Sequence, residues 1–374
     1  MKSENAVIIV GGGLAGLTCA IHLLKFGFNV TLIEKNTYPH HKVCGEYISN
    51  EVLPYLKWLD ADPAQLGPTT INRLSISSAS GKTINSQLPL GGFGISRFTL
   101  DNFLFEKARQ NGCTIVTDSV TSIDFKDDSF AIGTTKNGLL NGRIVIGAYG
   151  KRSSLDQKLE RGFIQKKSPW LAVKAHYEGD FPDDLVALHN FKGGYCGVSK
   201  VENGAINVCY LTDYQSFKTH KNIADFQKQV LYKNPHLEKI FENCVPLFDQ
   251  PLTISQISFE KKEPVFNHVL MIGDTAGLIH PLCGNGMAMA IHSAKICAEL
   301  TIQFLNGTTP SRSILENNYQ KEWSRNFKRR LTTGKLLSGI IRKEKLFAPL
   351  LNLLIKFPSI LPVIIKKTHG KPII

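Results

Sequence analysis

The sequence predicts an α/β fold built on a dinucleotide-binding unit, and three observations support this prediction. The apolar run 6–10 leads directly into a glycine-rich turn at 11–16 and then into a helical pattern over 17–26. A second apolar run, 30–34, ends on a glutamate. Late in the chain the apolar run 268–272 again leads into a glycine turn. Strand, glycine turn, helix, strand and acid within about thirty residues is the order of a Rossmann-type unit.

Each glycine of the first turn has a physical reason. Gly11 lets the chain turn tightly, Gly13 lets a pyrophosphate approach the backbone, and Gly16 lets the helix pack closely on the sheet. The free amides and the dipole at the helix start then hold phosphates. Glu34, eighteen residues after Gly16, is placed to accept hydrogen bonds from ribose hydroxyls and would repel a 2′-phosphate. The unit therefore favours FAD or NAD over NADP.

Composition indicates an ordinary globular protein. The 374 residues are 43% hydrophobic and 20% charged, enough for two domains and a sizeable core. No apolar run approaches the length of about eighteen residues that a membrane-spanning helix needs. Only residues 1–5 precede the first strand, so we expect no signal peptide and a cytoplasmic protein. The eight cysteines form no CxxC pair, and His40 and His41 have no partner at metal-ligand spacing, so we expect no metal.

The first third of the chain continues with mixed elements. The segment 35–49 is polar and is expected to form a loop that leads to a short helix near 51–59. Residues 61–96 combine short β-type runs with Gly and Pro. The apolar spacing over 97–108 is that of an amphipathic helix, and 113–125 contains two strand-like runs.

The middle of the chain predicts a second lobe. Four runs alternate as strands of an antiparallel sheet do, and they occupy 170–177, 186–191, 194–199 and 205–211. A helical stretch at 222–232 interrupts them, and the second glycine turn leads into a long helix over 287–305. The first domain is therefore discontinuous. The boundaries we expect are 1–165, with inserted short strands, and 263–310 for the cofactor domain, 166–262 for the antiparallel-sheet substrate lobe and 311–374 for a C-terminal helical tail that is basic and apolar.

Three separated motifs resemble one family. GGGLAG at 11–16 with Glu34, GAYGKRS at 147–153 and GDTAGLIHPLCGNG at 273–286 are similar to the aromatic-hydroxylase superfamily of FAD proteins. That superfamily includes para-hydroxybenzoate hydroxylase, flavin-dependent halogenases and geranylgeranyl reductases. VCGEYIS at 43–49 and the stretch 193–208 look most like the geranylgeranyl-reductase branch. The resemblance implies an α/β Rossmann-type FAD-binding domain with an inserted antiparallel β-sheet substrate lobe and C-terminal helices.

The resemblance also implies roles for single residues. Asp274 would accept hydrogen bonds from the ribityl chain, and the helix start at 284–287 would stabilise negative charge on the reduced flavin. Arg97 and Lys42 would contact the FAD backbone and phosphates, with a solvated surface charge as the alternative for each. The residues expected to bind FAD are Gly11, Gly13, Leu14, Ala15, Gly16, Glu34, Lys35, Lys42, Cys44, Gly45, Arg97, Val120, Gly273, Asp274, Gly284, Gly286 and Met287.

Three residues are candidates for catalysis. Cys44 lies in the loop that, by resemblance, reaches the flavin, where the matching cysteine of the reductases affects how far reduction proceeds. Pro281 would lie beside the isoalloxazine ring, and His280 would face the substrate as an acid or base. The alternatives are a small apolar thiol for Cys44 and a structural histidine for His280.

The sequence departs from the family pattern at two positions. Tyr149 replaces an Asp of the middle motif, and Cys196 replaces a Trp of the reductases' sheet motif. The chain has no second GxGxxG, so NAD(P)H would bind only transiently as reductant.

Three functions follow from the resemblance. The first is reduction of a carbon–carbon double bond in a small apolar substrate, isoprenoid- or polyene-like. The second is an NAD(P)H- and oxygen-dependent monooxygenase acting on an aromatic or polyketide-like ring; a halogenase is disfavoured because the Trp-x-Trp-x-Ile-Pro motif is absent. The third is a flavoprotein reduced by a redox-protein donor.

The tail is basic over 325–345 and apolar over 346–355 and 360–365. It is either a helical cap on the second lobe or a segment that lies on an anionic membrane or covers an apolar pocket. The alternative localisation is therefore peripheral, at the inner face of the membrane. Because the rest of the net charge of +13 is spread along the chain, we expect no nucleic-acid partner.

Overall fold

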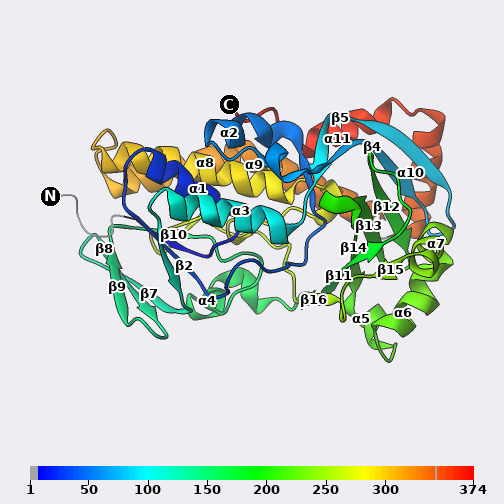
Figure 1. Cartoon of the computed structure of the whole chain (residues 1–374), viewed down its shortest axis with the longest axis horizontal. Coiled ribbons are helices and arrows are strands. Elements are labelled where there is room, and N and C mark those ends of the chain that lie inside the picture. The colour runs from blue at the N-terminus through cyan, green and yellow to red at the C-terminus, as the bar shows by residue number, and fades with distance from the viewer. Residues whose placement is uncertain (1–6, 342) are drawn as a thin grey trace.

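The computed structural model describes residues 7–341 and 343–374, so Ala6 of the expected first strand, the segment 1–5 and Arg342 of the basic tail lie outside the described residues. Two lobes lie side by side in Figure 1. The first lobe contains the sheet with the glycine turn. The second contains a larger sheet, and the C-terminal helices lie beside it.

The first lobe is built on a mainly parallel sheet with the strand order β17-β18-β10-β1-β2-β6. Only β17 runs antiparallel, at one edge. The central strands are buried on both faces, which explains why their sequences are continuous apolar runs. The bounds are β1 Val7–Val10, β2 Val30–Glu34, β6 Thr114–Thr117, β10 Ile144–Gly147, β17 Val265–Phe266 and β18 Val269–Met271.

Helices cover one side of this sheet, and a small sheet lies on the other side (Figure 1). The covering helices are α1 (Leu14–Lys25), α3 (Arg97–Gln110) and α8 (Gly286–Leu305). The small sheet has the order β7-β8-β9. Its bounds and those of two short helices are β7 Val120–Lys126, β8 Ser129–Thr134, β9 Leu139–Gly142, α2 Leu53–Trp58 and α4 Ser154–Lys158.

The second lobe contains a nine-stranded sheet with the order β15-β11-β14-β13-β12-β4-β5-β3, and β16 pairs with β11. Its strands are β3 Tyr47–Ser49, β4 Thr69–Ser77, β5 Thr83–Gly94, β11 Trp170–Glu178, β12 Leu185–Phe191, β13 Gly194–Lys200, β14 Ile206–Asp213, β15 Val245–Pro246 and β16 Leu252–Ser255. The four strands expected from alternation are all present.

The boundary of the sheet lobe differs from the expected 166–262. Three of its strands, β3 to β5, come from residues 47–94, and β4 pairs with β12 in parallel rather than antiparallel fashion. Short β-type runs identify strands, but they contain no information about a pairing partner more than a hundred residues away. The partner is set by tertiary packing, here of Leu74 beside Val186.

The two faces of the second sheet have different cover. Successive side chains of a strand point to opposite faces of the sheet. Val173 and Val208 point to the face that helices cover, which we call the outer face. Ala172 and Leu211 point to the opposite face, which borders the main cavity. The helices on the outer face are α5 Tyr214–Lys218, α6 Ile223–Val230 and α7 Pro235–Asn243. Only α6 matches a helix expected from the sequence.

The C-terminal residues form three helices, α9 (Arg312–Ile341), α10 (Glu344–Lys356) and α11 (Ile360–Thr368). They pack on one another and on β5. A buried stripe of Phe347, Leu351, Leu354, Leu361 and Ile365 contacts the second sheet. The expected helical cap is therefore present. No single helix in the described part of the chain is long and apolar enough to cross a membrane, although α10 and α11, bent by 119°, reach that length and composition as a pair.

Short 3₁₀ helices complete the fold. Two of them, η6 (Gly273–Thr275) and η7 (Pro281–Cys283), form the second glycine turn. The others are η1 Asn50–Val52, η2 Pro63–Leu66, η3 Gly162–Gln165, η4 Glu202–Gly204 and η5 Leu231–Lys233.

Candidate active site

A cavity of about 600 Å³ extends from the glycine turn of the first lobe to the C-terminal helices. At one end it is lined by Gly13, Glu34, Arg97 and Asp274. At the other end its walls are aliphatic side chains of β4, β5, β12, α10 and α11. The cavity therefore joins a polar region to an apolar one.

The geometry of the first turn requires glycine. Gly11 has a φ of +108°, and a Cβ there would lie 2.4 Å from the carbonyl oxygen of Ala148. A Cβ on Gly16 would lie 2.0 Å from the carbonyl oxygen of Gly11, so strand and helix are in direct backbone contact. A Cβ on Gly13 would point toward Arg97, 3.5 Å from its guanidinium. The tight turn at Gly11 and the close packing at Gly16 agree with the roles expected from the sequence, and the approach of a pyrophosphate to Gly13 stays a prediction.

Two cationic side chains, Arg97 and Lys42, line the cavity near the start of α1. Within the described residues no side chain caps this helix, and its first turn contains no acidic residue. Arg97 makes two hydrogen bonds to Asp101, at 2.6 and 2.7 Å, and Lys42 lies 3.0 Å from the same carboxylate. Burial raises the pKa of Asp101, but Arg97 and Lys42 hold that pKa below its ordinary value. The Asp101 carboxylate compensates only one of the two positive charges of Arg97 and Lys42. The remaining positive charge and the uncapped amides of the α1 start suit the pyrophosphate of FAD.

Glu34 is fixed at the carboxyl end of β2. Its Oε2 accepts a hydrogen bond from the Gly12 amide at 2.7 Å, and its Oε1 accepts from the amide and side chain of Asn36, both at 3.1 Å. The Tyr38 hydroxyl donates to the Gly12 carbonyl and thereby ties the following loop to the turn. The carboxylate lines the cavity, where a ribose would lie.

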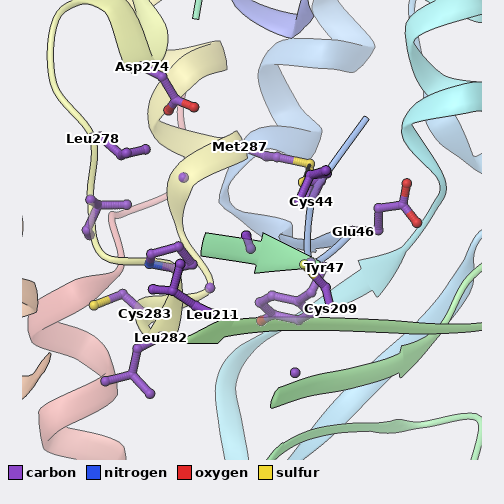
Figure 2. A pocket seen from close by; sticks show the side chains of 18 of the residues that line it. Cys44, Glu46, Tyr47, Cys209, Leu211, Asp274, Leu278, Leu282, Cys283 and Met287 are labelled. Atoms are coloured by element: carbon purple, nitrogen blue, oxygen red, sulfur yellow. Dashed lines mark hydrogen bonds between the residues drawn. The ribbon is translucent and has the colours of Figure 1, made fainter. Parts of the chain in front are cut away.

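The second glycine turn faces the first across the cavity. Gly273 and Gly284 both have a φ of +60°. The helix α8 follows at once, and no described side chain caps its start. Figure 2 shows Cys44 and Met287 pointing toward each other, and the Cys44 Sγ lies 3.5 Å from the Met287 Sδ. The loop that contains Cys44 therefore meets the start of α8.

A buried charged cluster supports this loop, and the sequence did not predict it. Glu46 is fully buried with a φ of +53°. Its carboxylate accepts hydrogen bonds from Lys174 Nζ at 2.6 Å, from His176 Nε2 at 2.6 Å and from the Arg97 amide at 2.8 Å. Burial by itself raises the pKa of Glu46. The hydrogen bonds and charges of His176 and Lys174 lower that pKa by more than burial raises it, so the net shift is downward. The signal was available in β11, where Lys174 and His176 alternate within an apolar strand.

The same cluster brings metal-ligating groups together. Ligand atoms of His41, Glu46 and His176 all lie within 4.8 Å of one another, although no metal was expected from sequence spacing. Burial, followed by the charges of Lys174 and His176, lowers the pKa of His41 to about 4. Because the Lys174 ammonium already compensates the Glu46 carboxylate, we interpret this cluster as a structural support of the loop.

Most of the expected site residues line the cavity. They are Gly13, Leu14, Ala15, Glu34, Lys35, Lys42, Cys44, Gly45, Arg97, Gly273, Asp274, Pro281, Gly284, Gly286 and Met287. Gly11 and Gly16 shape the turn from behind. Val120 begins β7 in the small sheet, and it is not among the lining residues.

His280 does not line the cavity either. It is 6% exposed, and its ring centroid lies 4.7 Å from that of Phe259 and 5.8 Å from those of Trp170 and Tyr195. This aromatic surrounding favours the structural alternative for His280, and its acid or base role stays a prediction. Pro281, the next residue, does face the cavity.

The thiols near the apolar end remain neutral. Burial raises the pKa of Cys209 to about 12 and that of Cys283 to about 12. Both side chains line the cavity (Figure 2). They therefore add apolar surface rather than charge to the region between the turn and the second sheet.

The middle motif touches the second glycine turn. The Gly150 amide donates to Thr275 Oγ1 at 2.8 Å, and the buried Arg161 donates to the Thr275 carbonyl at 2.9 Å. Tyr149, which stands where the resemblance implies an Asp, lines the cavity, and its hydroxyl lies 3.4 Å from Met271 Sδ.

Comparisons with known proteins give one family model and several relatives. The model of the FAD dependent oxidoreductase family matches residues 6–44. Digeranylgeranylglycerophospholipid reductase 2 of Methanothermobacter thermautotrophicus is 25% identical over 90% of this chain and 89% of that protein.

Two solved structures illustrate the range of proteins with this fold. The flavin-dependent brominase Bmp2 has a TM-score of 0.80 at 17% identity, over 98% of this chain and 93% of that one. A geranylgeranyl bacteriochlorophyll reductase-like protein from Thermoplasma acidophilum has a TM-score of 0.74 at 19% identity, over 98% and 92%. By sequence match and fold, the chain is similar to FAD-dependent oxidoreductases, among them geranylgeranyl reductase-like proteins and, in fold, halogenases.

Proposed function

We propose that the protein reduces a carbon–carbon double bond of an apolar, isoprenoid- or polyene-like substrate with hydride from reduced FAD. The observation that supports this most is the apolar end of the cavity. Its wall is aliphatic and consists of Leu74, Ile76, Ile84, Leu88, Val186, Leu188, Leu350, Leu351, Leu354, Leu361, Ile364 and Ile365. Such a wall binds a hydrocarbon chain by excluding water and offers few partners to a polar ring.

Residues at the polar end of the cavity would bind FAD, and residues at the apolar end would bind the substrate. The start of α1 with Arg97 and Lys42 would hold the pyrophosphate, Glu34 the ribose and Asp274 the ribityl chain. FAD, when bound, supplies the hydride. The start of α8 would face the flavin ring, where its amides would favour negative charge. The aliphatic wall would place the alkene beside that ring.

Alkene reduction also needs a proton at the second carbon. Cys44 lines the cavity beside the start of α8, and we propose its thiol as the donor. A general acid contributes typically about 10²- to 10⁴-fold. Cys44→Ala should therefore lower the rate at least about a hundredfold while the Kd for FAD stays within twofold. Cys44→Ser keeps a proton donor, the hydroxyl, at the same position, although its C–O bond is shorter than the C–S bond. This variant should recover part of the rate.

The relatives support the same substrate class. The Methanothermobacter protein is named for a digeranylgeranyl lipid, whose chains are long apolar polyenes. The electron donor we propose is NAD(P)H, bound transiently, with a small redox protein as the alternative. Anaerobic mixing with NADH, NADPH or reduced ferredoxin, followed by flavin bleaching, separates the two.

The test of the reaction is an anaerobic single turnover. The flavin is reduced by light and mixed with a geranylgeranyl lipid, and the product is analysed by mass spectrometry. The proposal predicts a gain of two hydrogens per reduced bond together with flavin reoxidation. An unchanged lipid, combined with a transient peroxyflavin band on mixing with oxygen, would instead identify a monooxygenase.

A further inference from the structure

The positive charge of the chain is concentrated near its C-terminus. Residues 324–374 contain twelve Lys and Arg residues against a single Glu, whereas the whole chain has a net charge of +13. Most of the net charge therefore lies in the second half of α9, in α10 and α11, and in the segment that follows them. Concentrated basic charge attracts polyanions, of which nucleic acids and anionic lipid surfaces are the common ones.

Large apolar side chains are exposed on the same helices. They are Leu336, Leu346, Leu353, Ile355, Phe357, Ile360 and Val363. Leu346 and Leu353 are seven residues apart on α10 and so lie on one side of it, away from the stripe that packs on the sheet. Leu353 is 47% exposed and Val363 on α11 is 54% exposed. Exposed aliphatic side chains among lysines suit a bilayer interface rather than a nucleic acid.

A basic cleft of about 690 Å³ lies between α9, α11 and β5. Its cationic lining residues include Arg325, Arg329, Lys366, Lys367 and Lys371. Tyr47, Leu88, Ile365 and His369 line both this cleft and the main cavity. The cleft and the apolar end of the cavity are therefore adjacent. An anionic group in the cleft would lie close to the hydrocarbon region.

We propose that the surface formed by the second half of α9 with α10 and α11 docks on an anionic lipid bilayer. The exposed aliphatic side chains would enter the interface, and the lysines and arginines would contact lipid phosphates. In Figure 1, α10 and α11 lie at the end of the molecule beside β4 and β5. Their buried stripe faces the cavity while their outer side faces the bilayer, so a lipid-soluble substrate has a short path between the two. The docking does not depend on the proposed reaction.

The test uses the full-length protein and vesicle flotation. Vesicles of phosphatidylcholine alone are compared with vesicles that also contain phosphatidylglycerol. We expect binding to the anionic vesicles, weakened by added salt because salt screens the attraction. Lys366→Gln with Lys367→Gln should weaken that binding about thirtyfold, from the typical contribution of each basic residue near a charged membrane. Leu353→Ser with Val363→Ser should weaken it at least about tenfold.

The matched control is another exposed lysine pair, Lys218 at the end of α5 and Lys221 three residues after it. Lys218→Gln with Lys221→Gln should leave vesicle binding within twofold of the unsubstituted protein. The proposal is overturned if the protein does not float with anionic vesicles, if both lysine pairs have the same effect, or if duplex DNA displaces the vesicles as effectively as free anionic lipid does. Reduction of a detergent-dispersed substrate is measured separately, so failure of the reaction and failure of the docking remain distinguishable.

Discussion

The two ends of the cavity are built in different ways. The cofactor end depends on a few residues close in sequence, with Gly11, Gly13, Gly16 and Glu34 all in one strand–helix–strand unit. The apolar end combines strands from 69–94, a strand from 185–191 and helices from 344–368. Backbone geometry and charge determine the first end, whereas packing among distant elements determines the second. Substitutions should therefore affect cofactor binding and substrate binding separately.

The largest effect is expected at the cofactor end. Gly11→Ala introduces a Cβ 2.4 Å from the Ala148 carbonyl oxygen at a φ of +108°, so the glycine turn must move away from the end of β10. We expect FAD affinity to fall more than about a hundredfold in a fluorescence titration, since the loss of a fitted backbone site costs several kcal/mol. Gly27→Ala is the control, because Gly27 also has a positive φ, of +78°, but no described atom lies within 4 Å of its Cβ position. Equal losses in the two variants would refute the packing argument.

The next effect is expected where the two ends meet. Glu46→Gln leaves Lys174 buried without its counter-charge, which costs about 3–5 kcal/mol of unfolding free energy. The pKa of Glu46 is lowered in the folded protein, so its stabilisation is complete above the ordinary pKa and is lost as pH falls through the folded-state value. The difference between the two proteins in urea unfolding should therefore shrink below pH 4.5.

Glu178→Gln, two residues beyond His176 in β11, is the matched control because Glu178 is exposed. It should change the unfolding free energy by less than about 0.5 kcal/mol. A Glu46→Gln protein as stable as this control would show that the buried cluster does not support the loop.

At the apolar end the effect should fall on substrate alone. Leu188→Trp places a larger side chain in the apolar end of the cavity, so the substrate chain has less room and makes fewer contacts with the aliphatic wall. We therefore expect KM for a geranylgeranyl substrate to rise about tenfold or more. The Kd for FAD should stay within twofold. Leu139→Trp, at a position 68% exposed in β9, is the control and should change neither constant. A parallel loss of FAD affinity in Leu188→Trp would contradict the separation of the two ends.

The last effect concerns a residue that lines neither end. Burial, and then the charges of Arg330 and Lys295, lower the pKa of His292 to about 4. Between pH 6.5 and 4 the unfolded chain therefore binds a proton that the folded chain does not, so stability falls as pH falls. His292→Leu should remove about 1.4 kcal/mol per pH unit from that slope. Identical slopes in the two proteins would show that His292 does not titrate in this way.

Sequence reasoning succeeded where the information is local. The glycine turn, Glu34 and the start of α8 lie within short motifs, and the structure brings all of them to one cavity. The four alternating strands of the second lobe were likewise found, because alternation is a property of single segments.

Sequence reasoning failed where the structure depends on contacts between segments far apart in the chain. The strands at 47–94 were expected in the cofactor domain, since nothing in a short β-type run shows that β4 will pair with β12. The aliphatic wall was missed for the same reason, because its residues share no motif. Glu46 was missed as well, although the motif around it was identified, because its partners Lys174 and His176 lie in another lobe.

The most direct test of the central claim is the anaerobic single turnover of photoreduced protein with a geranylgeranyl lipid. The account predicts that the flavin is reoxidised without oxygen and that the lipid gains two hydrogens for each reduced bond. If the flavin stays reduced in the presence of the lipid, and a peroxyflavin band then forms when oxygen is admitted, the apolar end binds something other than an alkene to be reduced.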